Sequence, residues 1–264
     1  MQWKSYVGGV VLASMVLLLG CQPIQAPTPQ PAAEAAAQAD APAATSDDEL
    51  IQHFRTAVVD AKDAEPAEIV DTLTALTPDN TNLVFEEGTG RLLMVTWTSW
   101  NGYDTLVGQD TKLQREVWVT AVPEVRTFCQ NYQADATPRD LRLEELLGLP
   151  PHNGKTRFVE MWVPLDALFR PSPDPEVDDT TAGLELPDAS AFASEQDYEF
   201  HRDWYNLQVS LSYDAQNGYP WTRLGYTYDW GNPESEVGLS EFVIYAGSTV
   251  GVAKVYGNDE YCAQ

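Results

Sequence analysis

One segment near the C-terminus combines aromatic and charged side chains densely enough to build a binding surface. Residues 219–230 carry five aromatic side chains together with Arg223 and Asp229. Flat rings stack on sugar faces or peptides, and an arginine grips a carboxylate through two hydrogen bonds. The alternative is a core strand whose rings fill the interior, with Arg223 paired to Asp229. The candidate binding residues are Trp221, Arg223, Tyr228, Asp229 and Trp230.

An acidic loop is the one candidate for a metal site. Asp174, Glu176 and Asp178 alternate along it, and Glu185 stands at the twelfth position counted from Asp174. Oxygen ligands at alternate positions with a late glutamate suit Ca²⁺, and this spacing resembles the EF-hand loop. It departs from that loop because Asp179 replaces the turn glycine and no helix precedes it. We therefore expect a solvated acidic loop and no metal, with Ca²⁺ as the alternative.

Carboxylates that could act as general acids or bases are too numerous for a pair to be chosen from the sequence. Two are distinctive: Glu160, within an expected strand, and Asp203, beside His201 on an expected helix where both should be exposed. A glycosidase needs two carboxylates facing each other about 5–10 Å apart. The common nucleophile, zinc, phosphate and dinucleotide motifs do not occur, so we assign no catalytic residues and no cofactor.

The sequence begins with features of an export signal. Lys4 precedes an apolar run over residues 7–19, which as a helix of about 20 Å is too short to span a membrane. The run ends in Leu18-Leu19-Gly20-Cys21, which resembles the lipobox of bacterial lipoproteins. That resemblance implies cleavage before Cys21 and attachment of acyl chains such as palmitate to it, anchoring the protein in a membrane. The alternative is an ordinary signal peptide.

The lipoprotein resemblance also predicts a location. Gln22 follows the cysteine, where Asp tends to retain such proteins in the inner membrane, so Gln22 implies the outer membrane if the cell has one. Residues 1–20 are then the signal peptide, residues 21–45 an Ala- and Pro-rich tether, and residues 46–264 a globular domain outside the cytoplasm.

Two cysteines remain for the domain, Cys129 and Cys262. An exported protein with an even number of cysteines favours a disulfide between them. The alternatives are two buried thiols, or a nucleophilic Cys129 paired with a histidine, although no histidine has a supporting spacing.

The net charge of −25 indicates which partners are excluded. Nucleic acids and anionic lipid headgroups require basic patches, so neither is expected to bind. A strongly acidic chain suits Ca²⁺ or a cationic partner, or simply presents a solvated acidic surface.

Local patterns predict an α+β domain with a mainly antiparallel sheet packed by several helices. Helices are expected to begin at Ser46 and at Pro66, the latter burying Ile69, Leu73 and Leu76. A third long helix, residues 194–212, should bury its apolar face. That face consists of Phe200, Trp204, Leu207 and Leu211. Strands are expected at 83–97 (a hairpin), 117–119, 158–163 and 224–230, with a closing hairpin at 242–256.

These observations favour a non-enzymatic envelope lipoprotein that binds a glycan, a peptide or a protein through an aromatic surface. The main alternative is a hydrolase that acts on envelope polymers with paired carboxylates. A structural accessory, whose lipid and tether matter more than any pocket, is the third hypothesis.

Overall fold

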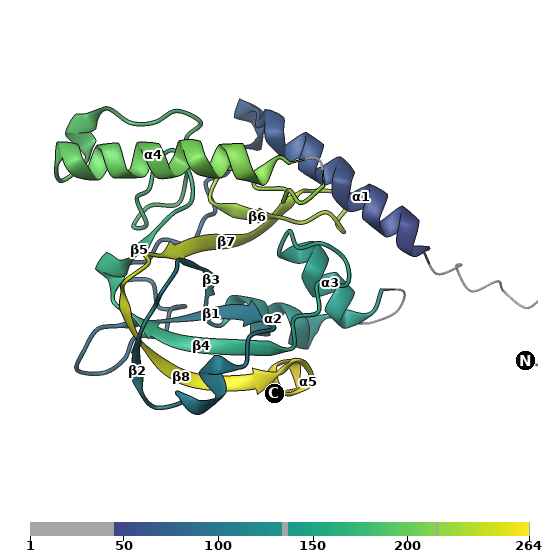
Figure 1. Cartoon of the computed structure of the whole chain (residues 1–264), viewed down its shortest axis with the longest axis horizontal. Helices are drawn as coiled ribbons and strands as arrows, with labels where there is room; N and C mark the ends of the chain where they lie inside the picture. The colour runs from purple at the N-terminus through teal and green to yellow at the C-terminus, as the bar shows by residue number, and fades with distance from the viewer. Residues whose placement is uncertain (1–44, 134–136, 215, 264) are drawn as a thin grey trace, which may run out of the picture. The chain divides into compact units, whose positions relative to one another are not determined.

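The computed structural model describes residues 45–133, 137–214 and 216–263, which an antiparallel sheet organises (Figure 1). The predicted signal peptide, Cys21 and the tether up to residue 44 lie outside the described residues. The sheet has eight strands in the order β2-β8-β4-β1-β3-β7-β5, with β6 paired to β7. Its strands are β1 Leu92–Thr98, β2 Asp110–Lys112, β3 Val117–Ala121, β4 Arg157–Val163, β5 Leu168–Phe169, β6 Tyr226–Tyr228, β7 Val237–Ile244 and β8 Thr249–Gly257.

Helices and short 3-10 turns surround the sheet, so the predicted α+β class is confirmed. The α-helices are α1 Asp47–Asp60, α2 Glu124–Asn131, α3 Arg139–Leu146, α4 Glu195–Ser212 and α5 Asn258–Cys262. The 3-10 turns are η1 Ala61–Asp63, η2 Pro66–Glu68, η3 Gly102–Thr105, η4 Leu165–Ala167 and η5 Ala189–Ala191. No helix within these described ranges is both long and apolar enough to cross a membrane.

Helix α1 follows its sequence pattern closely. The Ser46 hydroxyl accepts a hydrogen bond from the Glu49 amide, and the Glu49 carboxylate accepts one from the Ser46 amide at 2.9 Å. This reciprocal capping satisfies donors that a helix start leaves unpaired. Leu50, Phe54 and Val58 are buried in one cluster with Trp230.

The two C-terminal strands reveal how strongly the sheet curls. Segments 242–246 and 250–256 were expected to pair as a hairpin, but β7 pairs with β3, β5 and β6, whereas β8 pairs with β4 and β2. Four strand spacings, about 19 Å along the sheet, separate β7 from β8. Yet residues 245–248 form a turn closed by a 3.2 Å hydrogen bond from the Ser248 amide to the Tyr245 carbonyl. A turn of four residues spans under about 7 Å, so the sheet bends to bring its distant strands together (Figure 1).

Alternate residues of the strands divide into two hydrophobic cores, one on each face of the sheet. On the loop-covered face, Met94, Met161 and Phe242 pack with residues from connecting segments. On the helix-covered face, Val95 and Phe158 pack with residues of α2, α3 and α5. Because β1 lies between β4 and β3, both of its faces are buried, as its unbroken apolar run indicates.

A cysteine pair joins α2 to the C-terminal helix α5. The Cα atoms of Cys129 and Cys262 lie 5.4 Å apart and form the disulfide expected from the sequence. Both cysteines belong to the core of the helix-covered face.

The helix expected from Pro66 to Leu76 does not form. Only the turn η2 is helical, after which the chain is irregular and hydrogen-bonds to a distant loop. The amides of Leu73 and Leu76 donate to the carbonyls of Thr180 (2.9 Å) and Val177 (2.6 Å). Leu73 and Leu76 enter different clusters, whereas Ile69 is 38% exposed. Tertiary pairing therefore overrides the helical spacing.

The strand segments at 83–97 and 224–230 are shorter than expected. In the first, Phe85 makes only an isolated bridge to Leu92 before β1 begins. In the second, only β6 is a strand.

Helix α4 forms where predicted, with Ser194 as its cap, but it buries a different face. Its buried residues are His201, Tyr205 and Ser212, while Phe200 and Leu207 are more than half exposed. His201 was expected on the surface. Its Nε2 instead donates to the carbonyls of Ser172 (2.9 Å) and Pro173 (3.2 Å), which satisfy it inside the protein.

Candidate functional site

The five residues singled out in the aromatic segment do not share one surface. Trp230 is buried, and its indole N–H donates to the Leu149 carbonyl at 3.0 Å. The Tyr228 hydroxyl donates to Asp60 at 2.7 Å. The fold thus uses the polar atoms of both rings.

The charged residues of that segment do not pair with each other, contrary to the core-strand alternative. Asp229 accepts two hydrogen bonds from the Arg142 guanidinium, at 2.8 and 2.6 Å. Arg223 donates to the Lys62 carbonyl at 2.6 Å, with its own backbone in the left-handed region (φ 62°). Each finds its partner on another element, because the backbone turns at Arg223 before β6 begins.

Trp221 and Tyr228 do contribute to a large cleft, which is the leading candidate site. The cleft has a volume of about 960 Å³ and lies over the helix-covered face, against β1, β3 and β7. Residues 147–149, which follow α3, border it, as do Gln208 and Ser212 of α4. Pockets that bind small molecules commonly enclose about 300–1,000 Å³.

Glu241 of β7 lines this cleft and is the residue that the sequence analysis missed. Its side chain is 8% exposed, and its Oε1 is buried without a hydrogen-bond partner. None of the ion pairs among the described residues includes it. Burial raises the pKa of Glu241 well above its usual range, because desolvation penalises the charged form.

The position of Glu241 follows from strand register. Glu241 pairs with Thr120 of β3, Thr120 with Val95 of β1, and Val95 with Glu160 of β4, which places the four residues in one row across the sheet. Its amide donates to the Gly225 carbonyl at 3.0 Å. One signal could have identified it: an acid at the apolar period-2 positions of residues 237–244.

Trp118 and Trp221 form an aromatic wall of the cleft, and Trp204 packs beside them. Trp118 lies two residues before Thr120 on the same face of β3, and its ring centroid is 6.4 Å from those of Trp204 and of Trp221. Trp221 is held by a 2.9 Å hydrogen bond from its indole N–H to the Pro171 carbonyl. Trp118 is only partly buried, so it presents ring surface to the cleft.

Basic side chains also line the cleft. Lys112 and Arg115 are exposed. Lys155 donates to the Trp97 carbonyl at 3.1 Å, and burial lowers the pKa of its ammonium. The Lys155 ammonium is therefore already hydrogen-bonded within the protein.

The two carboxylates considered for hydrolysis lie elsewhere. Glu160 accepts a 2.7 Å hydrogen bond from Arg126 and one of 3.3 Å from the Tyr256 hydroxyl. Asp203 is exposed on α4 and accepts hydrogen bonds from its neighbour Arg202. Neither lines the cleft.

The acidic loop considered for Ca²⁺ wraps around a buried arginine. Asp174, Glu176 and Asp179 have carboxylate oxygens within 4.8 Å of one another, whereas Asp178 and Glu185 are not part of this group. Arg170, fully buried, donates to the carbonyls of Glu176 (2.9 Å) and Asp179 (3.0 Å). A cation of the protein therefore already lies beside the loop.

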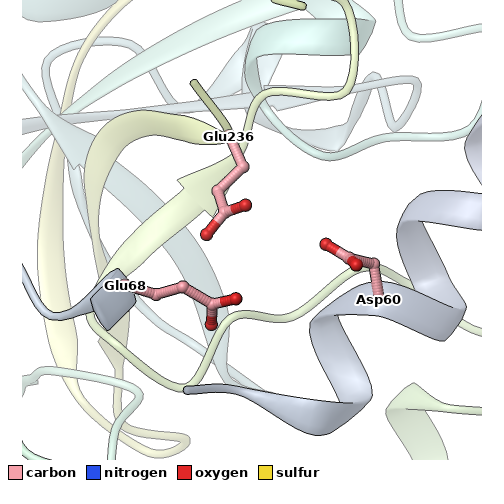
Figure 2. A group of neighbouring side chains, drawn as sticks. All are labelled: Asp60, Glu68 and Glu236. Atoms are coloured by element: carbon pink, nitrogen blue, oxygen red, sulfur yellow. The ribbon is translucent and has the colours of Figure 1, made fainter. Parts of the chain in front are cut away.

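A second acidic cluster consists of Asp60, Glu68 and Glu236, whose carboxylates point toward one another (Figure 2). Their oxygens lie within 4.8 Å, and the Tyr226 hydroxyl donates to Glu236 at 3.4 Å. Burial, Glu68 and Asp60 raise the pKa of Glu236. Such oxygens suit a hard cation, but all three residues are exposed or half-buried.

The cleft with Glu241 at its base is therefore the most distinctive site in the described part of the chain. No family model, no curated protein and no solved structure matches this sequence.

Proposed function

We propose that this chain is an exported, lipid-anchored envelope protein that binds a glycan or peptide in the aromatic cleft without transforming it. The observation that carries the proposal is the cleft itself, where Trp118 and Trp221 stand beside the buried carboxyl of Glu241. Aromatic faces stack on sugars and apolar side chains, while a few polar groups fix the orientation of a ligand.

The anchor rests on the sequence around Cys21. Leu18-Leu19-Gly20-Cys21 follows a short apolar run, and the Ala- and Pro-rich tether separates the cysteine from α1. Labelling of producing cells with an alkyne fatty acid should mark the protein, and mass spectrometry should find the acyl groups on an N-terminal Cys21. Cys21→Ser should abolish the label and release the chain from membranes. An unlabelled wild-type chain would disprove the anchor.

The binding proposal is tested with one ring inside the cleft and one outside it. The mature chain carrying Cys21→Ser, with or without Trp118→Ala, is screened against arrays of glycans and peptides. Phe200→Ala is the matched control, because Phe200 is 57% exposed on α4 and does not line the cleft. We expect Trp118→Ala alone to abolish retention. Equal loss in both variants, or no retention by the parent chain, would favour a structural accessory instead.

Two observations weigh against the hydrolase alternative. Glu160 and Glu241 lie in one row of the sheet, three strand spacings or about 14 Å apart along the backbone. Glycosidase carboxylates lie within about 10 Å of each other. Glu160 is moreover bound by Arg126. The retained ligand should therefore be recovered unchanged after prolonged incubation.

A further inference from the structure

The carboxyl of Glu241 is buried, and one of its oxygens has no hydrogen-bond partner. Buried polar groups are nearly always hydrogen-bonded, since a buried group without a partner has lost its hydrogen bonds to water and gained none in return. Glu241 is 8% exposed, its Oε1 has no partner, and the side chain lines the open cleft. A protein that needed only a packed core would gain stability from an apolar side chain at this position.

We infer that Glu241 is the counter-ion for a single amino group on the ligand. This inference rests on the proposed function and specifies the chemistry of what the cleft binds. Among the residues that the structure describes, no ion pair includes Glu241. Thr120 lies opposite Glu241 on β3, and the Gly225 carbonyl accepts a hydrogen bond from the Glu241 backbone amide. An ammonium would supply both the missing hydrogen-bond donor and the missing charge.

The tryptophans beside Glu241 fit the same ligand. Trp118 is on the face of β3 that carries Thr120, so its ring is a diagonal neighbour of Glu241. The Trp221 ring packs edge-on against the Trp118 ring, with an interplanar angle of 88°. A cation held over an indole face is attracted by the negative face of the ring, more strongly where water is excluded. Carboxyl and rings therefore favour a cation at the same place.

The charges around the cleft limit how many amino groups the ligand carries. Lys112, Arg115 and Lys155 line the cleft and would repel additional ammonium groups. The net charge of −25 still attracts a cation from a distance. A ligand with one amino group would be attracted by the net negative charge and would carry no further ammonium group for these basic residues to repel. It therefore fits the cleft better than a polycation.

Ammonium binding would be accompanied by proton release. Burial raises the pKa of Glu241 and so favours the protonated carboxyl in the empty cleft, whereas pairing with an ammonium favours loss of that proton. Tyr213, which follows α4, is also near Glu241, and burial raises its pKa. The Arg223 guanidinium lies 5.7 Å from the centroid of the Tyr213 ring. The remaining charged residues at the cleft are Lys112, Arg115, Glu116 and Lys155.

Two pairs of probes differ in whether one amino group is free or acetylated. The first pair is methyl glucosaminide and its N-acetyl form. The second is the peptide Ac-Gly-Lys-Gly-NH₂ and its Nε-acetyl-lysine form. Calorimetry and chemical-shift perturbation with the mature Cys21→Ser chain at pH 6.5, where both amines are largely protonated, should show the amine form of at least one pair binding about 10-fold more tightly. The pair that does so distinguishes a glycan source from a peptide source.

Glu241→Gln keeps the size of the side chain and should reduce the preference for the amine to about 1-fold. Glu87→Gln is the matched control, since it removes one carboxylate from an exposed turn outside the cleft. A preference that survives in Glu241→Gln would overturn the inference. Acetylated and amine probes binding equally to the parent chain would overturn it too, while leaving the proposed function intact. Failure of every probe to bind would overturn both.

One measurement avoids the variant altogether, in case Glu241→Gln does not fold. Calorimetry of amine binding in buffers with different ionisation enthalpies counts the protons released by the parent chain. We expect proton release on binding of the lysine peptide at one or more pH values between 5 and 8, because a bound cation lowers the pKa of the carboxyl. Absence of proton release at every pH in this range would overturn the inference, because Glu241 would then remain a neutral hydrogen-bond donor.

Discussion

Two glutamates in one cross-strand row differ in their hydrogen-bond partners. Glu160 and Glu241 face the same side of the sheet, and each is less than 10% exposed. Glu160 has Arg126 at 2.7 Å and the Tyr256 hydroxyl at 3.3 Å, whereas Oε1 of Glu241 has no partner. Burial raises the pKa of both, but only at Glu160 does a neighbouring arginine oppose it.

The comparison separates a charge that the fold satisfies from one that it leaves open. A satisfied ion pair adds specificity and costs stability when it is broken. An unsatisfied carboxyl costs stability in the resting protein, which is expected where a ligand completes the site. Glu160 and Glu241 are buried to a similar degree, so burial alone does not distinguish them. The presence or absence of a hydrogen-bond partner does.

The largest effect is expected when Glu160 loses its partner and is left, like Glu241, without one. Arg126→Ala leaves Glu160 without its cation and should lower the free energy of unfolding by about 3–5 kcal/mol. Urea denaturation at pH 7 measures this. Adding Glu160→Gln to Arg126→Ala should restore part of the loss. A decrease below about 1 kcal/mol would mean that Glu160 does not depend on Arg126.

Removing the unpaired carboxyl of Glu241 should stabilise the protein. Glu241→Met replaces the unpaired carboxyl with an apolar side chain of similar length and should raise the free energy of unfolding by about 1–3 kcal/mol at pH 8. Glu160→Met is the control with the opposite sign, because it leaves Arg126 unpaired. A destabilised Glu241→Met variant would indicate that the carboxyl already has a partner in solution.

Stability should also depend on pH in a way that the two glutamates distinguish. A carboxyl with a raised folded-state pKa binds its proton more tightly in the folded protein, so stability is lost as pH rises through that pKa. Burial raises the pKa of Glu124 and Glu145 to about 7, so both contribute to a decline between about pH 5 and 7. Burial also raises the pKa of Glu241, so this residue adds to the decline. Chemical denaturation between pH 5 and 9 should show a flatter profile for Glu241→Gln than for the parent chain, and identical slopes would contradict this.

The smallest effect is expected at the exposed end of the row. Lys254 pairs with Glu160 in the strand register but is exposed to solvent. Lys254→Met should change the free energy of unfolding by no more than about 0.5 kcal/mol, since solvent screens exposed pairs. Thermal melts in low and high salt measure this. A loss comparable to that of Arg126→Ala would assign the neutralisation of Glu160 to the lysine instead.

The sequence predicted which segments form helices better than it predicted their buried faces. In α1 the apolar stripe is the buried face, because Trp230 covers it. In α4 the same spacing leaves Phe200, Leu207 and Leu211 exposed, while His201 turns inward to the Ser172 and Pro173 carbonyls. Periodicity identifies a helix, but a distant loop decides which side of it is covered.

The site was less predictable than the fold for a related reason. Trp118 and Trp221 lie on separate elements, more than one hundred residues apart, and only the order of the strands brings them together. Glu241 follows from its period-2 position only once the face of β7 is known to line a cleft. The disulfide was predictable because only two cysteines remained after Cys21.

The cysteine pair has a consequence for how the chain withstands cutting. Residues 129 and 262 are covalently joined across 133 positions, and the irregular acid-rich segment 171–190 lies within that span. A protease that cleaves this segment would produce two peptides still tethered through sulfur. Trp118, ahead of the crosslink, and Glu241, inside it, would then remain parts of one molecule. Only cleavage combined with reduction would separate them, so a nicked chain should migrate as a single species until a thiol is added.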